Sequence, residues 1–210
     1  MTDKPTLCLV GAGGHGRVVA AQIQRDAQFA QNWSNIVFCD GGHELGSDCD
    51  GHEVRFERIK DIRDAEVLVT VGNNTVRSRL SVRAEALGLR VTSFVSERAH
   101  MISQEIPGAG TVVLAGAIVN WASVLGKGVI VNSGAVVEHD VVVGDFAHVS
   151  PSAVLSSGVH LGKGCWIGSN ASVVPQVTLS DGITVGAGAV VVEDLRSAGV
   201  YGGVPAKKVD

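Results

Sequence analysis

The 210-residue sequence is poor in aromatic side chains, which make up only 4% of it. It has no apolar run of membrane-spanning length and no apolar segment after Met1, so we expect neither a membrane helix nor a signal segment. Basic residues do not outnumber acidic ones, and the net charge of −4 argues against a nucleic-acid partner. There is also no block of like charge that would indicate a disordered tail.

Cysteine is scarce and irregularly spaced. Cys8, Cys39, Cys49 and Cys165 form neither a metal-binding nor a redox motif, which favours a reducing compartment. We therefore expect a cytoplasmic protein.

A short repeat occupies the second half of the chain. A period of six fits neither a helix nor a flat sheet over this distance, whereas it fits a three-sided coil with one aliphatic side chain pointing inward per face. The fourth residue after each aliphatic one is small or β-branched, which suits a tight corner, and the 27 glycines suit frequent turns. The repeat predicts a parallel β-helix. The aliphatic positions are Val113, Val119, Leu125, Val131, Val137, Val143, Val149, Leu155, Leu161, Ile167, Val173, Leu179, Val185 and Val191.

The first half of the chain alternates predicted strands and helices, which indicates a small parallel α/β domain. We place the boundary where the helical pattern stops, giving domains of residues 1–96 and 97–210. The expected strands are 6–10, 35–39, 66–71 and 90–95, the expected helices are 18–29 and 75–87, and residues 41–51 form an expected loop.

A glycine-rich loop follows the first predicted strand. Gly11, Gly13 and Gly16 match G-x-G-x-x-G between a strand and a helix, where backbone amides can cradle a phosphate. Asp40 lies where a ribose-binding acid would stand. The roughly ninety residues before the coil are too few for both halves of an NAD-binding fold, and His15 interrupts the loop. Three interpretations of the loop stay open: it binds a nucleotide-bearing ligand other than NAD, it binds NAD, or it has only a structural role.

A second glycine-containing segment, Gly72-Asn73-Asn74, directly follows the strand expected at 66–71. Ligands of open α/β sheets bind at this edge, so the two asparagine side chains are candidates to contact a base or a sugar. Capping of the following helix is the alternative role.

Three histidines lie in the regular repeat: His139, His148 and His160. His139 is expected at a corner beside Asp140, whose carboxylate can orient the ring for general base catalysis. His148 follows nine residues later, half a coil away, so the two rings can meet only between chains, as around a threefold axis. His160 is expected on the solvated surface. Because the histidine spacing of trimeric zinc hydratases is absent, we expect no metal.

Taken together, these motifs resemble the sialic-acid O-acetyltransferase-like (NeuD and PglD type) hexapeptide-repeat family over essentially the whole chain. The resemblance is carried by the glycine loop at 11–16, Gly72-Asn73-Asn74, Glu138-His139-Asp140 with His148, and Gly203-Val204-Pro205-Ala206. It implies a homotrimer with a left-handed β-helix and an N-terminal nucleotide-sugar domain. It also implies acetyl-CoA as co-substrate, bound along the groove between neighbouring coils.

The resemblance further implies roles for individual residues. His139 resembles the general base and Asp140 the acid that supports it. His148, Ser169 and Ala187 match positions that contact acetyl-CoA. The positions that match the nucleotide-sugar site are Gly13, Gly14, His15, Asp40 and Gly72, with Asn73 beside them.

The expected activity is acetyl transfer from acetyl-CoA to the amine of a nucleotide-linked amino-dideoxy sugar, without an acyl-enzyme. The alternatives are O-acetylation of a sugar such as a sialic acid, and a non-catalytic solenoid that binds a nucleotide sugar. The acceptor pathway would be polysaccharide or other glycan synthesis.

Overall fold

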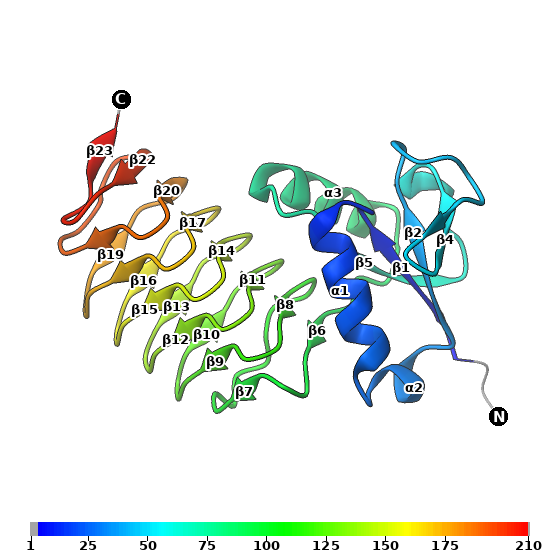
Figure 1. Cartoon of the computed structure of the whole chain (residues 1–210), viewed down its shortest axis with the longest axis horizontal. Helices are drawn as coiled ribbons and strands as arrows, with labels where there is room; N and C mark the ends of the chain where they lie inside the picture. The colour runs from blue at the N-terminus through cyan, green and yellow to red at the C-terminus, as the bar shows by residue number, and fades with distance from the viewer. Residues whose placement is uncertain (1–3, 210) are drawn as a thin grey trace. The chain divides into compact units, whose positions relative to one another are not determined.

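The computed structural model describes residues 4–209, and the chain divides into two units between Ser93 and Phe94 (Figure 1). Each unit has its own hydrogen-bonded sheets and its own buried core.

The first unit contains a five-stranded sheet in the order β3-β4-β2-β1-β5. All neighbouring strands are parallel except β3 and β4, which form an antiparallel hairpin. The strands are β1 (Thr6–Val10), β2 (Asn35–Cys39), β3 (Asp48–Cys49), β4 (His52–Phe56) and β5 (Ala65–Val69). The helices are α1 (Gly14–Arg25), α2 (Phe29–Asn32), the short 3-10 helix η1 (Ile59–Asp61) and α3 (Asn74–Ala86).

The central strands of this sheet are buried on both faces, as parallel strands between helices usually are. Cys8 and Val67 share a core cluster with Ala84 of α3 and with Ile62, so α3 covers one face. Figure 1 shows α1 lying across the sheet. The strands predicted at 6–10 and 35–39 are confirmed to the residue.

Three sequence expectations for this unit were wrong. The expected loop at 41–51 contains β3. Strand β4, which follows it, was not predicted. The first helix begins at Gly14 and ends at Arg25, because Asp26 is extended and accepts a hydrogen bond from the Gln28 amide at 3.1 Å. The expected strand at 90–95 does not form as one element: Val91 makes only a bridge to Val67.

The second unit is a parallel β-helix built of very short strands on three sheets, which confirms the predicted fold class. Sheet 1 contains β6 (Phe94–Val95), β8 (Val112–Val113), β11 (Ile130–Val131), β14 (His148–Val149), β17 (Trp166–Ile167), β20 (Ile183–Val185), β22 (Gly199–Gly202) and β23 (Lys207–Val209). Sheet 2 contains β7 (His100–Met101), β9 (Ile118–Val119), β12 (Val136–Val137), β15 (Val154–Leu155), β18 (Ser172–Val173) and β21 (Val190–Val191). Sheet 3 contains β10 (Val124–Leu125), β13 (Val142–Val143), β16 (His160–Leu161) and β19 (Thr178–Leu179).

Strands one coil apart pair in register, so Val119 lies beside Val137 and Val137 beside Leu155. The repeating aliphatic side chains form one continuous buried column. The small residues also point into this column; Ala117, for example, is completely buried directly after a turn. They allow the backbone to bend sharply around the core.

The second residue of the corner turns adopts a positive φ. Glycine occupies many of these positions, but Asp140 (φ 59°) and Ala122 (φ 56°) adopt the same left-handed conformation. This conformation is unfavourable for residues with a Cβ atom, and aspartate tolerates it better than most.

The coil ends in a hairpin. β22 continues sheet 1 in parallel with β20, and β23 then pairs with β22 in the antiparallel direction. Tyr201 is buried beneath it and donates a hydrogen bond to the Ser197 carbonyl at 2.9 Å. Across residues 4–209, no helix has the length and apolar character needed to cross a bilayer.

Candidate active site

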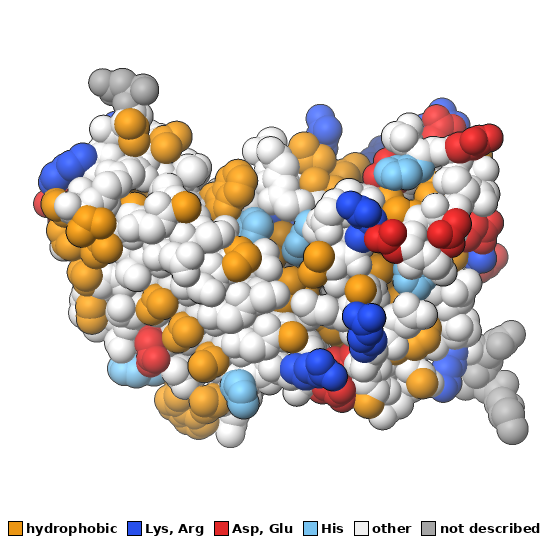
Figure 2. Space-filling model, in the orientation of Figure 1, with side chains coloured by type: hydrophobic (Ala, Val, Ile, Leu, Met, Phe, Trp, Pro, Cys, Tyr) orange, Lys and Arg blue, Asp and Glu red, His pale blue; other side chains and the backbone are white. Residues whose placement is uncertain are grey.

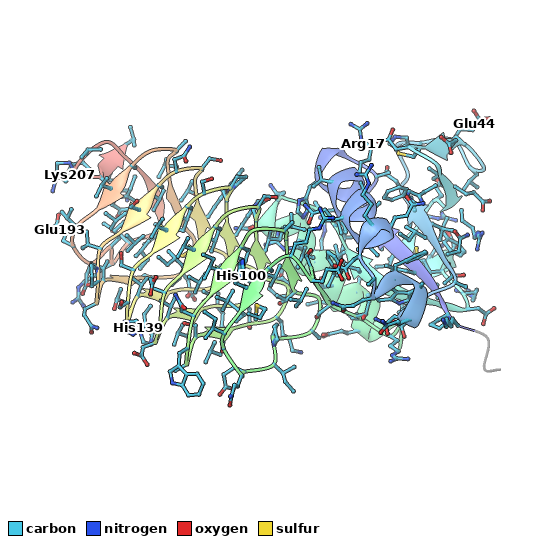
Figure 3. The ribbon with its side chains drawn as sticks, turned by 60° about the horizontal axis from the view of Figure 1, so that its bottom comes forward. Arg17, Glu44, His100, His139, Glu193 and Lys207 are labelled. Carbon is cyan, nitrogen blue, oxygen red and sulfur yellow. The ribbon has the colours of Figure 1, made fainter. Side chains whose placement is uncertain are left out.

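His139 and Asp140 occupy the corner between β12 of sheet 2 and β13 of sheet 3 (Figure 3). The Nδ1 atom of His139 lies 2.8 Å from Oδ2 of Asp140, and the two side chains are 54% and 65% exposed. Because the ionised carboxylate can only accept, Nδ1 carries the proton that joins the two groups. The Nε2 atom of the neutral ring is then the proton acceptor, as a general base requires.

Backbone hydrogen bonds hold this corner to both neighbouring coils. The Asp140 amide donates to the Trp121 carbonyl at 3.0 Å, and the His139 carbonyl accepts from the Gly158 amide at 3.0 Å. The buried Ser123 hydroxyl donates to the Glu138 carbonyl at 2.5 Å and accepts from the Val141 amide at 3.2 Å. The side chains of His139 and Asp140 therefore project from a rigid backbone into solvent.

His148 lies on sheet 1 and is almost fully buried. Its ring stacks on that of Trp166 with centroids 5.8 Å apart and planes 2° from parallel. Its Nε2 atom lies 3.1 Å from Nδ2 of Asn132, and Trp166 Nε1 donates to Ser150 Oγ at 2.8 Å. Neither supporting side chain, Asn132 nor Trp166, was expected from the sequence, although Trp166 follows His148 by one full coil and that spacing points to it.

Ser169 and Ala187 lie one coil apart at the corner that follows sheet 1, where the Gly188 amide donates to the Ser169 carbonyl at 2.9 Å. The three residues matched to acetyl-CoA therefore lie on sheet 1 and the corner after it. His139 lies instead between sheets 2 and 3, so the structure does not bring it together with His148 within one chain. His160 is exposed on sheet 3, as expected.

The described part of the chain contains no group of three His, Cys, Asp or Glu side chains able to hold a metal ion. The four cysteines are all buried thiols.

The glycine loop joins β1 to α1, and its glycines have different roles. A Cβ atom on Gly16 would lie 1.9 Å from the Gly11 carbonyl oxygen, so Gly16 is required for packing. A Cβ atom on Gly13 or Gly14 would meet nothing within 4 Å. These two glycines thus present open backbone at the start of α1, which is where a phosphate would bind.

Asp40 follows β2 and braces this loop. Its Oδ2 accepts from the Ala12 amide at 2.8 Å, and its Oδ1 accepts from the Gly42 amide at 2.8 Å. Partial burial opposes ionisation, but the two amide hydrogen bonds, together with the hydrogen bond and charge of His43, outweigh it and lower the pKa of Asp40. The carboxylate is therefore ionised and fixed in place at neutral pH.

A pocket of about 380 Å³ opens beside Asp40 at the carboxyl ends of β1 and β2. The wall from Glu57 to Ile59 was not expected from the sequence, because this segment follows strand β4, which was not predicted. The lining residues are Val10, Gly11, Cys39, Asp40, Gly41, Glu57, Arg58, Ile59, Val71 and Leu80.

Of the two roles considered for Asn73, the structure shows the cap: its side chain accepts from the Val76 amide at 3.0 Å at the start of α3. The fully buried Arg77 holds the preceding turn by donating to the carbonyls of Val71 and Gly72 at 3.0 Å each.

Burial, followed by the charge of Arg77, lowers the pKa of His15 to about 4. His15 is therefore neutral at physiological pH.

Comparisons with known proteins identify relatives for both units. Residues 6–84 match the family model described as the PglD N-terminal domain. The acetyltransferase domain of PglB from Neisseria gonorrhoeae is 35% identical over 98% of this chain and 100% of its own, with a TM-score of 0.90, and has also been solved with acetyl coenzyme A. PerB from Caulobacter crescentus, in complex with CoA and GDP-perosamine, is 30% identical over 98% of this chain and 97% of its own, with a TM-score of 0.87.

WeeI from Acinetobacter baumannii, at 20% identity and a TM-score of 0.64, shares the fold. The comparison with curated protein sequences gives no match. Identity at this level along nearly the whole length of two acetyltransferases establishes the family: the chain belongs to the sialic-acid O-acetyltransferase-like, PglD-type hexapeptide-repeat acetyltransferases, which use acetyl-CoA.

Proposed function

We propose that this protein transfers an acetyl group from acetyl-CoA to the amine of a nucleotide-linked amino-dideoxy sugar. The observation that carries the proposal is the 2.8 Å contact between His139 Nδ1 and Asp140 Oδ2 at an exposed corner. A relative with 30% identity is described as a perosamine N-acetyltransferase and was solved with GDP-perosamine, also with a histidine replaced by alanine or asparagine.

In this mechanism the sugar amine attacks the thioester carbonyl directly. As the C–N bond forms, His139 Nε2 takes a proton from the amine, and Asp140 stabilises the resulting imidazolium. The C–S bond then breaks and the proton passes to the leaving thiolate of CoA. A positioned base contributes about 10²–10⁴-fold, and placing both ligands in one cleft supplies much of the remainder.

The acetyl-CoA site is formed by His148, Ser169 and Ala187. Because these residues lie on sheet 1 and its following corner, whereas His139 lies between sheets 2 and 3, a complete site needs two chains. A homotrimer with active sites between subunits satisfies this requirement. Figure 2 shows hydrophobic side chains gathered along the lower edge of the second unit, and exposed Ile106 and Val124 offer apolar surface for such contacts.

The domain of residues 1–96 binds the nucleotide sugar, and that of residues 97–210 binds acetyl-CoA. The open backbone of Gly13 and Gly14 receives the diphosphate, with His15 and Gly72 beside it. The nucleoside occupies the 380 Å³ pocket next to Asp40. Asn73 contributes through its helix cap, which fixes the Gly72 turn.

We place the protein in the cytoplasm, where acetyl-CoA and nucleotide sugars are both made, and assign it to polysaccharide or glycan synthesis. Four buried free thiols are compatible with a reducing compartment.

The test is release of CoA thiol from acetyl-CoA across a panel of UDP-, GDP- and dTDP-linked amino sugars, with the matching hydroxyl sugars and a free sialic acid alongside. We expect release with an amino sugar nucleotide only. Release with the hydroxyl acceptors alone would identify an O-acetyltransferase, and release with none would favour a non-catalytic binding protein.

A second test replaces His139 by alanine. The control is His160→Ala, which removes another exposed histidine of the same β-helix. We expect His139→Ala to lower kcat at least about a hundredfold. His160→Ala should keep wild-type turnover, and both variants should keep the wild-type oligomer mass. Near-normal turnover of His139→Ala would refute the assignment of the base.

A further inference from the structure

Trp121 is the most exposed of the three tryptophans. Trp33 is buried and donates from its indole to Glu66, and Trp166 stacks on His148. The Trp121 side chain is 57% exposed, and no residue between 4 and 209 accepts a hydrogen bond from its indole nitrogen. A large aromatic group left in solvent contributes little to folding and is typical of surfaces that bind a ligand or a partner.

The position of Trp121 in the coil links it to the proposed base. Val119 and Val137 are paired in register, so Trp121 stands one coil before His139 at the same corner. The Asp140 amide donates to the Trp121 carbonyl at 3.0 Å, which fixes the two corners against each other. Neighbouring coils of such a ladder are about 4.8 Å apart.

The positions of other residues in the β-helix indicate from which side of His139 each substrate approaches. A sugar whose amine reaches His139 Nε2 must lie over one of the adjacent corners, Trp121 before it or Ser157 after it. The positions proposed for acetyl-CoA, Ser169 and Ala187, lie at a different corner and reach His139 only from a second chain; in a trimer whose coils run side by side, they stand level with coils later than that of His139. The acetyl donor then approaches from the Ser157 side, and the acceptor sugar lies over Trp121.

We propose that the indole of Trp121 is the platform on which the apolar face of the acceptor sugar rests, and that this contact favours a 6-deoxy sugar over its 6-hydroxy counterpart. The inference rests on the proposed function. The C–H groups of a pyranose ring and the C6 methyl group pack favourably on the electron-rich face of an indole. A hydroxyl on C6 would be desolvated there without a hydrogen-bond partner, so the 6-hydroxy analogue binds less well.

The experiment compares wild-type protein with Trp121→Ala and Trp121→Phe, using the sugar nucleotide that the acceptor panel identifies. Trp121→Ala should raise KM for this acceptor about tenfold and should lower the preference for 6-deoxy over 6-hydroxy sugar by a similar factor. KM for acetyl-CoA should change less than about twofold, and Trp121→Phe should recover most of the loss. Val192→Ala, an exposed apolar residue on the same side of the coil but further along, should behave as wild type.

A binding measurement separates the sugar contact from the nucleotide contact. Trp121→Ala should weaken binding of the whole sugar nucleotide but leave the affinity for the nucleoside diphosphate alone unchanged. Unchanged acceptor KM, a selective rise in KM for acetyl-CoA, or a change confined to the oligomer mass would each overturn the inference. Failure of the wild-type protein to acetylate any amino sugar would instead refute the proposed function.

Discussion

Asn132 fixes the tautomer of His148. The Asn132 Oδ1 atom accepts the Ser133 amide at 2.9 Å, so its Nδ2 group is the donor to His148 Nε2, 3.1 Å away. A ring nitrogen that accepts a hydrogen bond carries no proton, and the neutral ring must therefore hold its proton on Nδ1. The amide thus determines which edge of the imidazole can donate.

This relationship predicts the effect of Asn132→Asp. A carboxylate at this position accepts only, so it would draw the proton to Nε2 and reverse the ring's donor and acceptor edges. We expect KM for acetyl-CoA to rise about tenfold, with the acceptor KM little changed. Wild-type steady-state kinetics for this variant would contradict the tautomer assignment; Asn132→Ala should give a smaller defect because it removes the hydrogen bond without reversing it.

Asp140 combines a strained backbone with a proposed chemical role, and Asp140→Gly separates the two. Its φ of 59° is easily adopted by glycine, so we expect the melting temperature to stay level or rise. Turnover should nevertheless fall about 10²-fold, because His139 loses the carboxylate that orients it. Ser152→Gly (φ 60°) is the matched control and should share the stability effect while keeping activity. An active Asp140→Gly enzyme would exclude the carboxylate from the mechanism.

The glycine loop predicts opposite outcomes for two neighbouring substitutions. Gly16→Ala places a methyl group against the Gly11 carbonyl and should destabilise the first unit by several kcal/mol, on the order of the larger single-residue effects known. Gly14→Ala has room for its methyl group and should melt like wild type, yet bind the nucleotide sugar less tightly. Thermal denaturation and ligand titration of both variants check this, and normal nucleotide-sugar affinity of Gly14→Ala would argue against a phosphate at that position.

His15 predicts a loss of stability in acid. Its pKa is about 4 in the folded chain and 6.5 when unperturbed, because burial and then Arg77 disfavour its charged form. The unfolded chain therefore binds a proton that the folded chain does not, so the stabilisation is complete above pH 6.5 and is lost as the pH falls toward 4. By pH 5 the loss amounts to about 2 kcal/mol.

Denaturant unfolding at pH 7 and pH 5 measures this effect. His15→Gln should flatten the pH dependence of the free energy of unfolding, whereas His160→Gln, on an exposed histidine, should leave it as in wild type. An unchanged slope in His15→Gln would mean that another group titrates.

The repeat alone was sufficient to predict the second unit, because the inward side chain recurs every sixth residue and each coil repeats the last. Its frame also placed His139 at an exposed corner and His148 on the opposite side, as the structure has them. The family and the enzyme class are likewise confirmed. The roles of the individual site residues stay predictions.

What the sequence could not supply were features that depend on contacts distant along the chain. Strand β4 is stabilised by pairing with β2, and the alternation of buried and exposed side chains in His52–Phe56 is too short to identify the strand without that partner. The hydrogen bond that makes Asn73 a cap, and the Asn132 and Trp166 contacts that hold His148, likewise depend on how separate segments meet. Trp121 was overlooked because exposure, and not residue type, makes it notable.

The hairpin at the end of the coil has a consequence for solubility. A parallel β-helix that stopped at β20 and β21 would leave open strand edges on which another molecule could continue the ladder, as in a growing fibril. β22 still runs parallel to β20, but β23 reverses the strand direction on sheet 1, and this outermost strand carries Lys207 and Lys208. The hairpin therefore blocks further strand pairing at the end of the coil. Its removal should convert a protein of fixed size into one that associates end to end.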